Sequence, residues 1–137
     1  IRLALEVGMA DFIFSRKTEA DIEELEEIVK IEPDHSDNIL FDVDHELRFH
    51  GKLYKMTGND TLEDFQNLLL PAFQHVYNIG LLKVKGKRKK YKSHKELVSL
   101  LRSGTPDEFR MGMRRHLENH FSRILTENNP HAQENIQ

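Results

Sequence analysis

The hydrophobic positions of this chain recur at the three- and four-residue spacing of helices with one buried face. The longest pattern runs from about Ile39 to Thr57. The residues on its predicted buried face are Ile39, Val43, Leu47, His50, Tyr54 and Thr57. His50 lies near the centre of this face, and Glu46 lies one turn earlier at its edge. Because an unpaired polar group in a core is costly, both side chains need partners from elsewhere in the chain.

The chain before this central helix predicts two more helices. Residues 1–14 form an amphipathic pattern whose inward face consists of Leu5, Met9, Phe12 and Ile13. Thr18, with Asp21 three residues later, is close to a capping box and opens a second helix. Pro33 is expected to end that helix.

Start and stop signals after the central helix predict three further helices. The residues that mark their boundaries are Gly58, Asn59, Ser93, Gly104, Thr105 and Pro106. The short helix after Ser93 carries one stripe made of His94, Leu97, Val98 and Leu101. The last helix is expected to start at Thr105 and Pro106, because proline at the first helical position is a strong start signal. Its hydrophobic pattern continues to about Thr126. The sequence therefore predicts an all-α fold, an antiparallel bundle of about six helices.

Composition narrows the class of protein. The chain has 137 residues, which suits one domain, and 31% of them are charged. It contains no cysteine, which excludes disulfides and thiolate metal sites and favours a reducing cytoplasm. No run approaches the ~20 apolar residues of a membrane span, so we expect no membrane partner. The chain opens without methionine inside a helical pattern, which suggests that an N-terminal part is missing.

The charges are unevenly distributed. The net charge of −3 does not favour a nucleic-acid partner for the whole chain. The segment 83–95 nevertheless carries eight lysine and arginine residues and no acidic residue. A solvated loop explains this segment more simply than a phosphate-binding role does, but both interpretations stay open.

Histidines on three helices suggest a metal site. Besides His50, His94 belongs to the stripe of its helix, and His116 and His120 both flank the stripe of the last helix. Antiparallel bundles build metal sites from such inward side chains, and histidine with carboxylate suits zinc, nickel, manganese or ferrous iron. The alternative is a set of core histidines that are satisfied by ordinary hydrogen bonds.

Several motifs in order along the chain resemble one known family. They are Arg2-x-x-Leu5-Glu6, Thr18-Glu19-Ala20-Asp21, Glu46-x-x-Phe49-His50-x-x-Leu53, Thr57-Gly58-Asn59, Ser93-His94-x-x-Leu97 and Met113-x-x-His116-Leu117. Together they resemble the FCD domain, the effector-binding domain of FadR-type regulators in the GntR family of bacterial transcription factors. The likeness extends from Arg2 to about Phe121.

The resemblance implies a divalent metal ion, most readily zinc or nickel, at the floor of a pocket. The positions that match the family's ligands are Glu46, His50, His94 and His116. The family usually has aspartate in place of Glu46, and the longer glutamate can ligate the ion or serve as a partner of a histidine. The helical wheel places His120 nearer the stripe than His116, so His120 is the alternative ligand.

The resemblance also implies a small carboxylate effector, such as a sugar acid, a hydroxy acid or a dicarboxylate. Arg2 matches an arginine that faces the family's pocket and could bind the carboxylate in bidentate fashion. The alternative for Arg2 is a surface ion pair with Glu6, four residues later.

The expected function is ligand sensing by residues 1–127 of a GntR-type regulator, with a polar tail at 128–137. The winged-helix DNA-binding domain is expected to be absent from this chain, so DNA is contacted only through that missing part. Such regulators act as cytoplasmic homodimers. The main rival is a small helical metal-dependent hydrolase with Glu46 as general base. A third interpretation is a nucleic-acid binder that acts through the basic segment 83–95.

Overall fold

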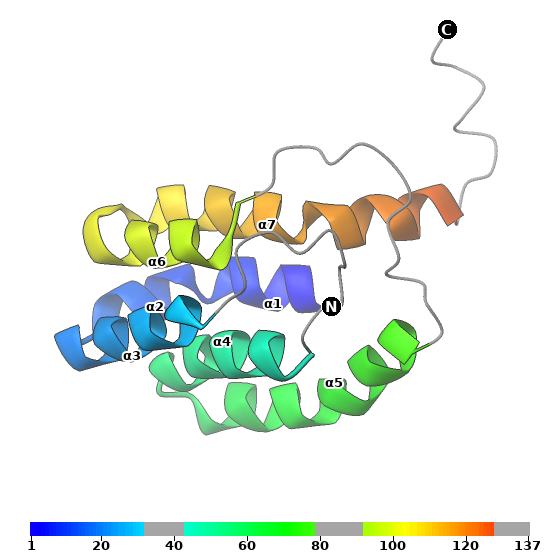
Figure 1. Cartoon of the computed structure of the whole chain (residues 1–137), viewed down its shortest axis with the longest axis horizontal. Helices are drawn as coiled ribbons and strands as arrows, with labels where there is room; N and C mark the ends of the chain where they lie inside the picture. The colour runs from blue at the N-terminus through cyan, green and yellow to red at the C-terminus, as the bar shows by residue number, and fades with distance from the viewer. Residues whose placement is uncertain (32–42, 79–91, 128–137) are drawn as a thin grey trace, which may run out of the picture.

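The computed structural model of the chain describes residues 1–31, 43–78 and 92–127. These residues form seven α-helices and no β-strand, which confirms the predicted all-helical fold (Figure 1). The helices are α1 (Arg2–Gly8), α2 (Ala10–Arg16), α3 (Glu19–Lys30), α4 (Val43–Met56), α5 (Asp60–Asn78), α6 (His94–Ser103) and α7 (Pro106–Glu127). Since α1 and α2 share one predicted segment, the expected number of about six also holds. Within these ranges, no helix has the length and apolar character that crossing a membrane requires.

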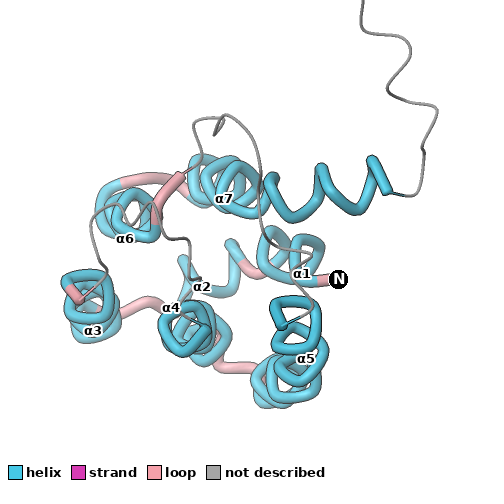
Figure 2. Tube along the Cα trace, turned by 45° about the vertical axis from the view of Figure 1, so that its right-hand side comes forward, coloured by secondary structure: helices cyan, strands magenta, loops and turns pink. Residues whose placement is uncertain are grey.

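The two N-terminal helices lie in the middle of the bundle. Figures 1 and 2 both place α1 and α2 between the pair α6 and α7 on one side and the pair α4 and α5 on the other. α1 packs against α7, and α2 packs against both α7 and α4. α3 bridges α4 and α6, whereas α5 packs chiefly against α4. The two N-terminal helices therefore separate α4 from the pair α6 and α7 over part of the bundle.

Reciprocal capping boxes start three of the helices. Thr18 and Asp21 cap α3, and Ser93 and Glu96 cap α6, each with both hydrogen bonds present. At the start of α7, Thr105 Oγ1 accepts from the Glu108 amide over 3.2 Å, while Glu108 Oε2 accepts from the Thr105 amide over 2.8 Å. Each cap contributes about 1 kcal/mol, so the sequence fixes where these helices begin.

A glycine turn joins α4 to α5. Gly58 has φ +61°, the left-handed conformation that ends helices. Asn59 Oδ1 then accepts from the Leu62 amide over 3.3 Å, as expected of the residue that caps α5.

The N-terminal segment departs from the prediction in two ways. A single helix was expected over residues 1–14, but the helix is interrupted at Met9, directly after Gly8, a residue of low helix propensity. The interruption is slight, because Met9 still donates to the Leu5 carbonyl and accepts from the Ile13 amide. Phe12 was predicted to face inward, yet it is 52% exposed. Ala10 takes the inward place beside Ile13, on the same helical face as Glu6 and Met9.

Two expected boundaries lie partly outside the described residues. The central helix was expected from Ile39, but the described helix begins at Val43, and residues 39–42 lie outside the described ranges. Pro33 also lies outside them, and α3 ends at Lys30.

The hydrophobic core draws on α2, α3, α4, α6 and α7. Its buried side chains are Met9, Ala10, Ile13, Ile22, Leu25, Val29, Phe49, Leu53, Tyr54, Met56, Leu97, Val98, Leu101, Phe109, Met113 and Leu117. Large side chains such as Phe49 each contribute about 1.5–3 kcal/mol when fully buried. The core holds α4, α6 and α7 in a fixed arrangement, and a group of polar residues lies within it.

Candidate metal centre

Helix α4 supplies two polar side chains to the centre of the bundle. Glu46 and His50 are one turn apart and lie on the same face, beside the buried ring of Phe49. Their exposed fractions are only 7% for Glu46 and 2% for His50. The expectation that both point into the core is met.

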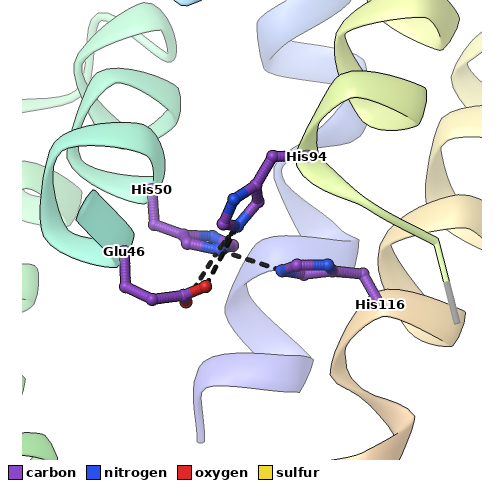
Figure 3. A group of neighbouring side chains, drawn as sticks. All are labelled: Glu46, His50, His94 and His116. Atoms are coloured by element: carbon purple, nitrogen blue, oxygen red, sulfur yellow. Dashed lines mark hydrogen bonds and ion pairs between the residues drawn. The ribbon is translucent and has the colours of Figure 1, made fainter. Parts of the chain in front are cut away.

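Two further histidines meet them from the opposite side of the molecule. His94 is the first residue of α6 and follows the Ser93 cap, while His116 comes from α7. Both are buried. Figure 3 shows the four side chains, from three helices, pointing toward one another. One potential ligand atom from each of the four residues lies within 4.8 Å of the others, an arrangement that could hold a metal ion.

The closest approaches converge on the Nε2 atom of His50. Nε2 of His94 lies 3.2 Å away and Nε2 of His116 lies 3.3 Å away. The carboxylate of Glu46 lies 3.3 Å from His50 Nε2 and 3.1 Å from His94 Nε2. A metal–ligand distance of about 2.1 Å separates adjacent ligands by about 3.0–3.4 Å in octahedral and tetrahedral sites. The observed separations therefore match the edges of a coordination polyhedron.

Hydrogen bonds alone satisfy this cluster poorly. A neutral imidazole has one N–H, so His50 Nε2 donates to at most one of its three close neighbours, and to none when the hydrogen is at Nδ1. The remaining contacts then bring acceptor lone pairs together in a buried space, which is unfavourable. A divalent ion would accept all four lone pairs at once, so the donor set fits a metal better than it fits a network of hydrogen bonds.

The far side of each imidazole ring has its own support. His50 Nδ1 lies 2.5 Å from Glu6 Oε2, and His116 Nδ1 lies 2.7 Å from the main-chain oxygen of Lys92. The ring of His94 stacks on Phe49 with the ring centroids 4.2 Å apart. Such partners fix ring orientation and direct Nε2 toward the cluster.

Arg2 lies at the edge of the cluster. Its Nε donates to Glu6 Oε1 over 2.5 Å, and its Nη2 donates to Glu46 Oε2 over 3.0 Å. The pair with Glu6 that was considered as an alternative is therefore present. It is not a surface pair, however, because the Arg2 side chain is 20% exposed and that of Glu6 is fully buried. Arg2 thus reaches the cluster while paired with Glu6.

The electrostatics keep both carboxylates charged. Burial by itself raises the pKa of Glu46, but His50, His94 and Arg2 together hold that pKa well below its usual value. Burial likewise opposes the ionisation of Glu6, and Arg2 and His50 nevertheless lower its pKa to about 2. Burial, followed by the neighbouring His94, lowers the pKa of His116 to about 3, so this ring is neutral near pH 7 and can donate a lone pair.

Two buried polar residues near the cluster were not identified from the sequence. Glu6 was considered only as a partner of Arg2, although its spacing to Met9 and Ile13 places it on the buried face of the first helical segment. His45 is also buried, with its ring centroid 6.1 Å from that of His94. His45 does not belong to the predicted buried stripe of its helix, so the hydrophobic spacing did not identify it.

Two expectations lie outside the described part of the molecule. His120, the alternative to His116, belongs to α7, but its side chain is not among those described. Most of the basic segment lies at residues 83–91, which are also outside the described ranges.

A comparison with protein families matches the FCD domain over residues 1–119. The matched region contains Arg2 and all four residues of the cluster. Neither the comparison with characterised proteins nor that with solved structures gives a significant match. The family match confirms the resemblance that the sequence motifs indicated.

Proposed function

This chain belongs to the FCD family, the effector-binding domain of GntR-type regulators, and from that premise we propose that it senses a small carboxylate beside a bound divalent ion. The proposed ligands are Glu46, His50, His94 and His116. The observation that carries the proposal is the convergence of these four buried side chains, with ligand atoms within 4.8 Å of one another. Family membership also favours a regulatory sensor over the metal-dependent hydrolase, because FCD domains are typically not catalytic.

The donor set favours zinc or nickel. The three imidazoles are borderline ligands that suit zinc and nickel, the single carboxylate is a harder ligand, and the chain has no cysteine to select a softer ion. A bound ion would supply positive charge and open coordination positions. The protein's own part is to hold three imidazoles and one charged carboxylate in place before the ion arrives.

The charge of the buried cluster supports a carboxylate effector. Histidines that bind a metal are neutral, and the carboxylates of Glu6 and Glu46 then outweigh the guanidinium of Arg2 by one negative charge. A divalent ion changes this balance to one positive charge, which one carboxylate group neutralises. The loaded cluster should therefore attract a small carboxylate.

We place this domain within a larger regulator. Residues 1–127 form the sensing domain and residues 128–137 a polar tail. In such a regulator, a winged-helix domain would contact DNA. The protein acts as a homodimer in the cytoplasm, and the effector changes how two protomers are placed. The change in placement alters the spacing of the DNA-reading helices.

Calorimetric titration tests the proposal. Sugar acids, hydroxy acids and dicarboxylates are titrated into protein loaded with zinc or nickel and into the same protein after chelation. We expect at least one carboxylate to bind the loaded form about 5–150-fold more tightly, the usual range of coupling between paired sites. Equal binding after chelation would show that the ion plays no part in sensing.

Metal analysis and a hydrolysis assay complete the test. The purified domain should retain about one divalent ion per chain, and added ion should raise its melting temperature. The variant His94→Ala should lose the ion, while His75→Ala should keep it because His75 is exposed on α5. Turnover of an ester or amide by the loaded protein would favour the hydrolase instead.

A further inference from the structure

We propose that Glu6 is a positioning residue that orients both His50 and Arg2 through one carboxylate. The inference rests on the proposed function, since it concerns how the protein prepares the metal site. Glu6 belongs to α1, His50 belongs to α4, and the two are 44 positions apart in the sequence. The orientation of His50 therefore depends on a residue outside its own helix.

Each carboxylate oxygen of Glu6 contacts a different side chain. Oε2 lies 2.5 Å from His50 Nδ1, and Oε1 lies 2.5 Å from Arg2 Nε. The side chain is fully buried, so water cannot replace either contact. The four side chains Arg2, Glu6, His50 and Glu46 close a ring of contacts between α1 and α4, because Arg2 also donates to Glu46 and Glu46 lies 3.3 Å from His50 Nε2.

The chemistry of a carboxylate determines what this contact does to His50. An ionised carboxylate only accepts hydrogen bonds, so the Nδ1 atom of His50 must carry the hydrogen. The lone pair of His50 is then at Nε2, the atom that faces His94, His116 and Glu46. Negative charge at Nδ1–H also raises the basicity of the ring as a ligand.

His116 provides an internal control within the same site. Its Nδ1 lies 2.7 Å from the main-chain oxygen of Lys92, so a backbone carbonyl supports it in the same way. No substitution at Glu6 removes that carbonyl. The orientation of His50 should therefore respond to changes at Glu6, whereas that of His116 should not.

The second contact of Glu6 links the metal site to Arg2. Holding Nε of Arg2 leaves Nη2 directed at Glu46. A change at Glu6 should therefore weaken both metal binding and carboxylate binding. A residue that served only to fill space would not produce this double effect when a variant of the same size replaces it.

The experiment uses the full chain loaded with zinc, a diamagnetic ion. The variants are Glu6→Gln, which keeps the size and removes the charge, and Glu6→Asp, which keeps the charge and shortens the reach. Exposed Glu23 provides the matched control Glu23→Gln. Zinc affinity is measured by competition with a chelator, and nitrogen-detected NMR of the imidazole rings identifies which nitrogen carries hydrogen.

We expect Glu6→Gln to weaken zinc by about 10–100-fold, the usual cost of losing a partner behind a metal-bound histidine. The Nδ1–H signal of His50 should move upfield and exchange faster with water, and that of His116 should stay unchanged. Glu6→Asp should recover part of the affinity, and Glu23→Gln should match the wild type. Unchanged zinc affinity and an unchanged His50 signal in Glu6→Gln would overturn the inference.

If the variants fold poorly, NMR of the wild-type protein still tests whether Glu6 orients His50. In its zinc-loaded form, His50 should bind through Nε2 and show a hydrogen-bonded Nδ1–H. Ligation through Nδ1 would overturn the role of Glu6. Failure of the wild type to bind zinc or nickel at all would instead contradict the proposed function, so the two failures are distinguishable.

Discussion

Arg2 Nη2 donates a hydrogen bond to Glu46 Oε2 over 3.0 Å, which places a guanidinium against a proposed metal ligand. A small carboxylate that binds beside the ion would meet the same guanidinium. Lysine at this position keeps the charge but loses the planar fork that binds carboxylates in bidentate fashion.

Arg2→Lys should therefore weaken carboxylate binding to the metal-loaded protein by about tenfold to a hundredfold, because hydrogen bonds to charged groups contribute about 1.5–3 kcal/mol. Zinc affinity should change by much less, since all four proposed ligands remain. Calorimetry with loaded protein measures the first quantity, and chelator competition measures the second. A variant that loses zinc and carboxylate equally would place Arg2 in support of the metal rather than of the effector.

The two histidines at the middle of α7 can be separated by substitution. His116→Ala should abolish zinc retention, because its Nε2 lies 3.3 Å from that of His50 and no other described side chain replaces it there. His120→Ala should retain about one ion per chain. Elemental analysis after gel filtration gives the answer, with circular dichroism to confirm that both variants fold. The reverse result would make His120 the ligand.

Asp21 should contribute to stability in a pH-dependent way. Its hydrogen bond with Lys52 lowers its pKa below the usual 3.8, and Thr18 adds to the effect. Because the folded pKa lies below the unfolded value, the contribution is complete above about pH 4 and is lost as the pH falls through the folded pKa.

Asp21→Asn should therefore destabilise the protein near pH 6 and should lose less stability than the wild type on acidification below pH 4. The effect should stay below about 1 kcal/mol, since the pair is partly exposed. Urea unfolding at several pH values measures it, and Asp64→Asn on the exposed face of α5 serves as the matched control. Parallel pH curves for Asp21→Asn and the wild type would contradict the assignment.

The glycines at two helix ends should respond oppositely to alanine. Gly58 has φ +61°, and an added Cβ would lie 2.5 Å from a guanidinium nitrogen of Arg16. Gly58→Ala should cost about 1–2 kcal/mol, the usual penalty of the left-handed conformation. Gly8 has no atom within 4 Å of an added Cβ, so Gly8→Ala should be neutral or stabilise by up to about 1 kcal/mol. Chemical unfolding of the two variants tests the difference in sign.

Local signals in the sequence predicted the parts of the fold that depend on neighbouring residues. The caps at Thr18 and Ser93 and the turn at Gly58 need only residues within one helical turn, so they could be identified directly. The stripe that contains His94 was likewise visible from its spacing. These features established the helices and the sides on which they bury.

Contacts between distant residues could not be predicted in the same way. Nothing in the spacing of Glu6 indicates that its carboxylate meets His50, because that contact depends on how α1 docks against α4. The main-chain oxygen of Lys92 behind His116 has no signature in the residue type at all. Phe12 was misplaced because Phe12 and Ala10 flank the stripe of Met9 and Ile13 on opposite sides, and only the docking of the helix decides which of the two is buried.

The cluster also has a consequence for the order of events in folding. His50 and His116 are separated by 66 positions, and contacts of this kind form late because long chain segments must close first. No fragment that lacks either end of the assembly brings the four side chains together. A divalent ion would therefore have no site in the early, partly collapsed chain and would chiefly slow the unfolding of the finished domain. The ability to bind the ion thus reports that α4, α6 and α7 have come together, and it distinguishes the completed fold from its helical precursors.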